Sequence, residues 1–122
     1  TCHLNDSGID MSKFDDYLNI FDEKIGLDKI KCIHINDSKN IIGSHKDRHE
    51  NIGYGTIGFE NILNIIYNER LKDVPKILET SYVGETLEDK KRIYPPYLFE
   101  IKMIRAKKFD EILFNHIHEY YK

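Results

Sequence analysis

The chain has 122 residues, of which 40% are apolar and 32% are charged, and its formal net charge is −3. This composition is typical of one small globular domain and excludes a disordered chain. The slightly negative charge gives no global basic field, so a nucleic-acid partner has to be argued from local residues. The sequence has no run of about 18 or more apolar residues, so we expect no transmembrane helix.

Short apolar runs alternate with helical patterns along the chain. The expected elements, in chain order, are a strand end at Thr1–Leu4, a helix from Met11 to Ile25, a strand at Ile30–Ile35, a polar loop over 36–58, a helix from Phe59 to Tyr67, a strand at Val74–Glu79, and two helices that begin after Pro96 and Asp110. Apolar residues three or four positions apart predict the helices. Asp10 or Ser12 can cap the first helix, and Gly26 can end it. The polar loop holds four of the seven glycines.

Cys2 and Cys32 are the only cysteines, and each lies shortly before a histidine inside an apolar run. We expect both to be buried, reduced thiols rather than a disulfide, as in a cytoplasmic protein. The chain has no signal-like segment, although it begins without an initiator Met. The expected location is therefore the cytoplasm.

The β–α–β–loop–α–β–α–α order predicts an α/β fold with βαβ units and a parallel sheet. All three expected strands end near a polar residue, namely His3, His34 or Glu79. In a (β/α)8 TIM barrel, the carboxyl ends of the strands build the active site. Three strands cannot close such a barrel. We therefore expect residues 1–122 to be the C-terminal portion of one barrel domain, about strands six to eight with their helices, with the N-terminal part missing.

Imidazole and carboxylate groups at successive strand ends are the groups from which a hydrolytic zinc site is built. Asp47 and His49 are two residues apart, so an extended segment would turn both side chains to the same face. Glu79 is expected to be partly buried, and a buried carboxylate needs a partner or a metal. Each residue also has a plainer interpretation. His34 can be a hydrogen-bonded core histidine, Glu79 a member of a structural salt bridge, and Asp47 and His49 parts of a solvated loop.

Taken together, these segments resemble the endonuclease IV family of apurinic/apyrimidinic endonucleases in order and in spacing. The segments that carry the resemblance are Thr1-Cys2-His3, His34-Ile35-Asn36-Asp37-Ser38-Lys39, the loop from Gly43 through Asp47-Arg48-His49 to Gly58, and Ile77-Leu78-Glu79-Thr80. The part from Asp47 to Gly58 is highly specific, and the resemblance extends to about residue 108. Tyr82-Val83-Gly84 and Pro95-Pro96-Tyr97 are similar to the bacterial branch. Ser81 departs from the proline usual there, which predicts a slightly looser loop.

The resemblance implies a TIM barrel of the xylose-isomerase-like type, with three zinc ions in the intact enzyme. His3, Asp47 and His49 match the three protein ligands of one zinc, and this set is complete here. His34 and Glu79 match two ligands of a second zinc, and they are the expected catalytic residues. The other ligands would belong to earlier strands.

The implied function is DNA base-excision repair by zinc-dependent hydrolysis of the phosphodiester 5′ to an abasic site. The products would be a 3′-OH and a 5′-deoxyribose phosphate. Arg48 matches a DNA-recognition residue, and Lys39 and Lys46 would add local positive charge. The expected partner is double-stranded DNA with abasic sites, bound by a monomeric enzyme that has no membrane partner.

Two other interpretations stay open at this point. A metal-dependent sugar isomerase or epimerase of a related barrel also has His and Glu at its strand ends, but it lacks the Asp47-Arg48-His49 loop with its trailing glycines. A non-catalytic, truncated remnant is the stronger rival, because part of the zinc ligand set is missing. Alone, the chain is expected to be inactive and to expose an unpaired strand edge.

Overall fold

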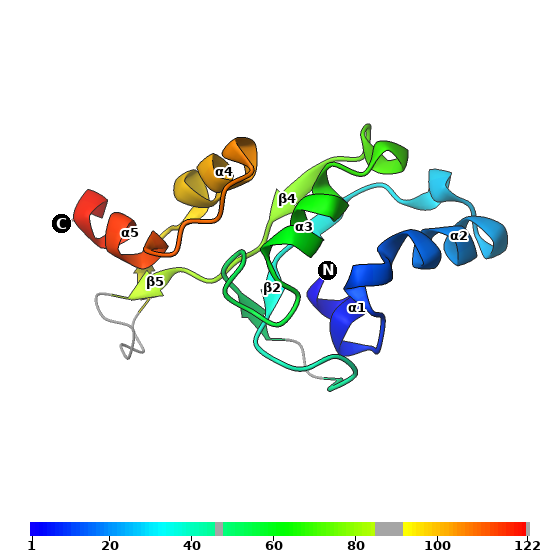
Figure 1. Ribbon diagram of the computed structural model, residues 1–122, viewed down its shortest axis with the longest axis horizontal. Helices are drawn as coiled ribbons and strands as arrows, with labels where there is room; N and C mark the ends of the chain where they lie inside the picture. Colours follow the sequence, from blue (N-terminus) through cyan, green and yellow to red (C-terminus); the bar gives the residue numbers. More distant parts are fainter. Residues whose placement is uncertain (46–47, 85–91, 122) are drawn as a thin grey trace.

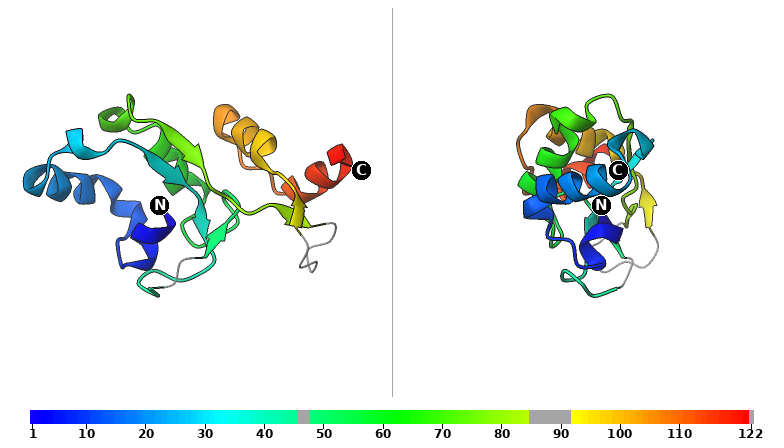
Figure 2. Two further views of the ribbon diagram at one scale, coloured as in Figure 1. Left: turned by 180° about the vertical axis from the view of Figure 1, so that it is seen from behind. Right: turned by 90° about the vertical axis from the view of Figure 1, so that its right-hand side faces the viewer.

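The computed structural model describes residues 1–45, 48–84 and 92–121. Its elements in chain order are α1 (Cys2–Asp6), η1 (Met11–Lys13), α2 (Phe14–Lys24), η2 (Leu27–Lys29), β1 (Ile33–Ile35), β2 (Asp37–Ser38), β3 (His49–Glu50), α3 (Phe59–Ile66), η3 (Glu69–Leu71), β4 (Lys76–Leu78), β5 (Val83–Gly84), β6 (Arg92–Tyr94), α4 (Tyr97–Ala106) and α5 (Leu113–Tyr121). The molecule is elongated, with α2 at one end and α4 and α5 at the other (Figures 1 and 2). The strands β1 to β4 lie between these two helical ends, and β5 and β6 lie at the end formed by α4 and α5.

The strands β1 and β4 form a parallel pair, with His34 opposite Ile77 and Ile35 opposite Leu78. The helix α3 lies between them in the chain, so β1, α3 and β4 make the βαβ unit that the sequence predicts. His34 and Ile77 lie on one face of the pair, and both are exposed. The helices therefore cover only the opposite face, which includes the buried Ile35.

Two antiparallel pairs complete the described strands, and the sequence predicts neither of them. Pairing of β2 with β3 places Ser38 opposite His49, so the expected polar loop contains a short hairpin. Pairing of β5 with β6 places Val83 opposite Tyr94. Strands of two or three residues give almost no periodic pattern, which explains why sequence reasoning missed them. The β2–β3 pair returns His49 to the segment that follows His34.

The strand end expected at Thr1–Leu4 is wrong, because this segment belongs to the helix α1. A side chain from another element holds the start of this helix. The Cys2 amide donates to the Asn36 Oδ1 atom at 2.8 Å, and the Asn36 amide donates to the Thr1 Oγ1 atom at 3.0 Å. These contacts take the place of a strand ladder. The predicted strands at Ile30–Ile35 and Val74–Glu79 are present but shorter, as β1 and β4.

The helix signals in the sequence are confirmed. The Asp10 side chain accepts a hydrogen bond from the Ser12 amide at 3.0 Å, which caps η1 before α2. Gly26 follows α2 with a φ of 103°, a conformation that favours glycine. The helix α4 begins after Pro96, and the Asp110 carboxylate accepts from the Ile112 amide at 3.0 Å just before α5.

One hydrophobic core runs through the described residues, and it includes Leu18, Ile35, Ile52, Ile62, Ile65, Leu113 and Ile117. Aromatic contacts connect the α5 end to the glycine-rich loop, because the Tyr54 ring lies 5.1 Å from that of Phe109 and 4.7 Å from that of Phe114. No helix in the described ranges is long and apolar enough to cross a membrane.

The two cysteines differ in exposure. Cys2 is fully buried, as expected, but Cys32 is exposed, so that expectation is wrong for Cys32. The reason is the open face of the β1–β4 pair, because alternation places Cys32 on the same side as His34. Neither cysteine forms a disulfide.

Candidate metal centre

His34 and Glu79 meet at the carboxyl ends of the two parallel strands. His34 lies within β1, and Glu79 follows directly after β4. The His34 Nδ1 atom and the Glu79 Oε2 atom are in direct contact, and the side chains remain 59% and 47% exposed. About half of the Glu79 side chain is covered, so this carboxylate is only partly buried. An imidazole and a carboxylate in contact on an accessible surface are two donors of the kind that zinc binds.

His49 lies beside this pair, because its ring contacts the backbone of Glu79. The His49 Nδ1 atom is 2.9 Å from the Glu79 carbonyl oxygen. A hydrogen bond from a histidine ring to a backbone carbonyl fixes the orientation of the ring, as it does for histidines that bind metals. The β2–β3 hairpin makes this contact possible, because it brings His49 back past the end of β1.

His3 lies in α1 and is exposed. The helix is anchored through the neighbouring Cys2, whose thiol lies within hydrogen-bond distance of the Arg48 carbonyl oxygen, at 3.4 Å, and of the Asp6 carboxylate, at 3.6 Å. The Cys2 amide is held by Asn36. The segment with His3 therefore lies against the segment with Arg48 and His49.

Asn36 connects the three segments that carry the predicted ligands. Its side chain accepts from the Cys2 amide at 2.8 Å and donates to the Glu79 carbonyl oxygen at 3.5 Å. It is only 2% exposed and follows β1 directly. Sequence reasoning gave Asn36 no role of its own.

The donor chemistry of the site fits zinc, since imidazole nitrogens and a carboxylate are zinc ligands. Within the described ranges, however, no three His, Cys, Asp or Glu side chains lie close enough together to hold a metal ion. Of the predicted ligands, the structure brings His34 and Glu79 into contact and places His49 on the backbone of Glu79. Asp47 lies outside the described residues, and so does Lys46.

Two buried carboxylates hold the loop that follows His49. The Asp37 carboxylate is fully buried and accepts hydrogen bonds from the amides of Ser38, Gly53, Ile57 and Gly58 at 2.8 to 3.2 Å. Burial raises the pKa of Asp37 above its ordinary value, although these donors favour the charged form. Gly55 passes so close that an added Cβ would lie 2.3 Å from the Ser38 carbonyl oxygen. Only glycine fits there.

Glu100, on α4, is the second carboxylate, and it is also fully buried. It accepts from the Ile52 amide at 2.8 Å and from the Thr80 hydroxyl. Burial raises its pKa as well, against the opposing effect of these donors and of the Asn51 side chain. Sequence reasoning missed both Asp37 and Glu100 as site components, because each acts on residues far away in the chain.

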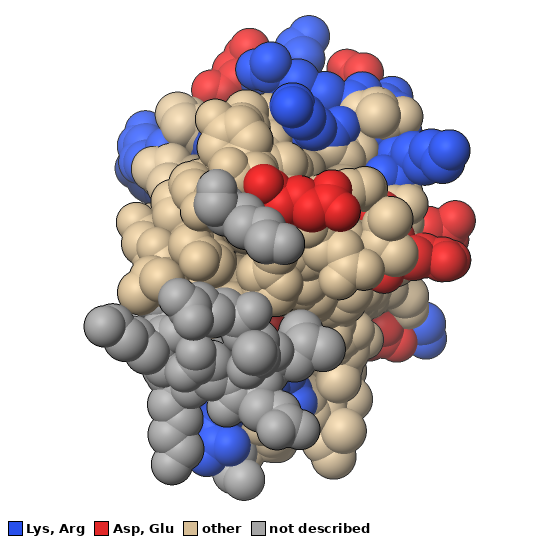
Figure 3. All heavy atoms as spheres, turned by 90° about the vertical axis from the view of Figure 1, so that its left-hand side faces the viewer, with Lys and Arg blue, Asp and Glu red and all other residues tan. Residues whose placement is uncertain are grey.

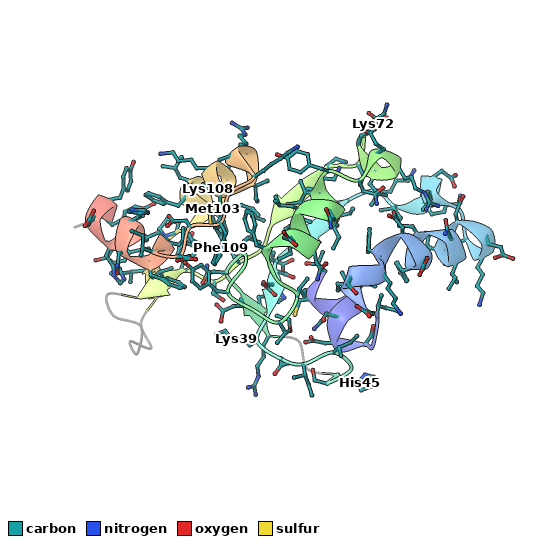
Figure 4. The ribbon with its side chains drawn as sticks, in the orientation of Figure 1. Lys39, His45, Lys72, Met103, Lys108 and Phe109 are labelled. Atoms are coloured by element: carbon teal, nitrogen blue, oxygen red, sulfur yellow. The ribbon has the colours of Figure 1, made fainter. Side chains whose placement is uncertain are left out.

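The predicted DNA-binding residues Arg48 and Lys39 are exposed neighbours. The Lys39 amide donates to the Arg48 carbonyl oxygen at 3.0 Å, and Lys39 lies at the lower edge of the molecule in Figure 4. Basic side chains also gather at the top of the face in Figure 3. Exposed cations of this kind on α4 and just after it are Lys102, Arg105, Lys107 and Lys108. Arg105, Lys107 and Lys108 lie at or just after the C-terminal end of α4, where cations offset the helix dipole.

The comparison with family models matches residues 1–97 to the xylose isomerase-like TIM barrel. This match covers well over half of the chain. The chain belongs to that family. The parallel β1–α3–β4 unit is the part of such a barrel that is directly visible here.

Similar proteins narrow the relationship further. The chain is 56% identical to the probable endonuclease 4 of Bacillus licheniformis and 55% identical to that of Bacillus subtilis, each over 118 residues. The structure is similar to that of endonuclease IV from Thermus thermophilus, with a TM-score of 0.68, 29% identity, and coverage of 86% of this chain and 35% of that one. These findings confirm the resemblance to the endonuclease IV family. Each of the two Bacillus matches includes 96% of this chain, but the chain spans only 39% of the length of those relatives.

Proposed function

We propose that this chain is the C-terminal part of a zinc-dependent DNA-repair endonuclease that hydrolyses the phosphodiester 5′ to abasic sites. The contact between His34 and Glu79 at the ends of parallel strands carries the proposal, because it pairs two zinc-type donors on an accessible surface. The similarity to endonuclease 4 proteins supports it. The products would be a 3′-OH and a 5′-deoxyribose phosphate.

Five residues would hold zinc in the intact enzyme. His3, Asp47 and His49 would serve one ion, and His34 and Glu79 would be two ligands of a second. Bound zinc would supply Lewis acidity that lowers the pKa of a coordinated water toward about 7. The Glu79 carbonyl oxygen fixes the orientation of the His49 ring. Asn36 connects α1, which carries His3, to the Glu79 backbone.

Arg48 and Lys39 would bind the DNA backbone near the lesion, with Lys46 as a further candidate in the same loop. Their exposure and adjacency support this role, since paired cations can neutralise neighbouring phosphates. We propose a monomeric, cytoplasmic enzyme that acts on double-stranded DNA with abasic sites. The 122-residue chain alone is not expected to cleave.

The first experiment measures zinc per chain by atomic emission and cleavage of a duplex with one synthetic abasic site. We expect about one zinc and no cleavage for the 122-residue chain, and cleavage by the full-length enzyme. In the full-length enzyme, His49→Ala should remove one zinc and lower kcat by orders of magnitude. The matched control is His45→Asn, since His45 is an exposed loop residue with a φ of 58° that asparagine tolerates. Full activity after loss of the His49 zinc contradicts the proposal.

A second comparison tests the DNA surface. Lys39→Ala should weaken DNA binding and reduce its salt dependence by about one phosphate contact. Lys72→Ala is the control, because Lys72 is also exposed but lies at the opposite edge of the molecule (Figure 4). Equal effects of the two substitutions would argue against a specific DNA surface at Lys39.

A further inference from the structure

Glu100 is a fully buried carboxylate on a helix that carries none of the predicted zinc ligands. Taking a charged group out of water is costly unless hydrogen bonds replace the lost solvation. Glu100 has these bonds, and its donors lie on two separate loops. The Ile52 amide donates to one oxygen at 2.8 Å, and the Thr80 hydroxyl donates to the other.

The two loops held by Glu100 are those that follow His49 and Glu79. Thr80 is the next residue after Glu79, and Ile52 lies three positions after His49. A second link runs between the same loops, because the Asn51 side chain donates to the Ser81 carbonyl oxygen at 3.0 Å. Glu100 therefore lies behind the His49–Glu79 contact and connects the backbone on both sides of it.

The start of α4 is also hydrogen-bonded to the loop that follows Glu79. The Tyr97 hydroxyl, one turn before Glu100, donates to the Thr80 carbonyl oxygen at 3.1 Å. Thr80 is thus bound to α4 through both its side chain and its backbone, and it is only 5% exposed. The position of Glu79 then depends on the docking of α4, although no contact joins Glu79 itself to that helix among the hydrogen bonds described here.

We propose that Glu100 is a positioning residue for the metal centre, which holds the His49 loop and the Glu79 loop at the separation that zinc binding needs. This inference rests on the proposed function, because it assigns a role toward the same zinc ligands. Partners of the ligating residues are known to change metal affinity or activity by about 10- to 100-fold when they are removed. Glu100 acts one step further away, so the expected loss is about tenfold.

The test uses Glu100→Gln in the full-length enzyme, which keeps the shape of the side chain but replaces one acceptor oxygen by a donor. Zinc affinity is measured by competition with a chromophoric chelator, and cleavage of abasic duplex gives kcat and KM. We expect about tenfold weaker zinc binding and a lower kcat, with KM for DNA unchanged. The matched control is Glu119→Gln, an exposed glutamate on α5, which should leave all three quantities unchanged.

A second pair of variants tests the hydrogen bond between Thr80 and Glu100 from the Thr80 side. This pair also keeps the test possible if Glu100→Gln does not yield folded enzyme. Thr80→Val replaces the hydroxyl by a methyl group and should reproduce the loss of zinc affinity. Thr80→Ser keeps the hydroxyl donor and should keep the zinc affinity of the wild type. In Glu100→Gln the amide oxygen stays with the Ile52 amide, which can only donate, and the NH2 group faces the Thr80 hydroxyl. Both substitutions therefore remove the hydrogen bond that Thr80 donates to Glu100, and the double variant should be no worse than the more affected single variant.

A purely structural role gives a different result. If the folded variants have a lower melting temperature but zinc affinity within about twofold of the wild type, the positioning role is overturned. The chelator measurement also separates this inference from the proposed function. A wild-type enzyme that binds zinc but does not cleave abasic DNA refutes the function, while the affinity ratio still decides the role of Glu100. A wild-type enzyme that holds no zinc overturns both.

Discussion

Asp37→Asn should destabilise the glycine-rich loop strongly, because Asp37 is an acceptor for four backbone amides. Its Oδ1 atom accepts from Ser38 and Ile57 at 2.8 Å, and its Oδ2 atom accepts from Gly53 and Gly58 at 3.2 Å. Asparagine can keep the first two bonds, but its NH2 group then faces two N–H donors. Each lost hydrogen bond to a charged group costs about 1.5–3 kcal/mol. Both lost bonds are long, so we expect the lower limit for each, about 3 kcal/mol in total.

Urea unfolding of the full-length protein, followed by circular dichroism at neutral pH, measures this loss of unfolding free energy. The matched control is Asp16→Asn, since Asp16 is exposed on α2, and it should stay within about 0.5 kcal/mol of the wild type. A loss below about 1 kcal/mol for Asp37→Asn would show that the loop does not depend on this carboxylate.

Three further predictions concern the burial of single groups. Gly55→Ala should cost about 3 kcal/mol of unfolding free energy, because its Cβ would lie 2.3 Å from the Ser38 carbonyl oxygen; a normal melting temperature would contradict this. Burial raises the pKa of Glu100 above 4.5, so the stability that this group contributes is fully present below its unfolded-state value and is lost as the pH rises through its folded-state value. Glu100→Gln should flatten that decline in unfolding free energy with pH, and a parallel pH profile would contradict it. A thiol reagent should label the exposed Cys32 in the native protein and the buried Cys2 only after denaturation; peptide mapping that finds equal native labelling would contradict this.

The sequence predicts the helices and the β1–α3–β4 unit well, because both produce local patterns of apolar residues. Apolar spacing defines α3, and the cap residue Asp110 marks the start of α5. The contact between His34 and Glu79 was predictable as well, since parallel strands bring their carboxyl ends to the same edge. The spacing to Asp47 already pointed to His49, but only the family resemblance assigned His3 and His49 to the same zinc ligand set.

The parts that sequence reasoning missed depend on contacts between distant residues. The helix α1 replaces an expected strand because Asn36, more than thirty positions later, binds its first turn. Glu100 reads locally as one polar residue in an amphipathic helix, but it lies buried against residues 48 positions away. Local periodicity contains no information about such partners.

The dependence of the His49 loop on α4 has a consequence for the order of events during synthesis. A ribosome adds about 5–20 residues per second, so the 48 residues between Ile52 and Glu100 take roughly 2 to 10 seconds to make. During that interval the nascent loop has Asp37 as an anchor but lacks its second carboxylate. Under the proposed function, the loops that carry His49 and Glu79 would reach their final spacing only after Glu100 has been synthesised, so a metal ion that meets the nascent chain earlier would encounter ligands whose spacing is not yet fixed.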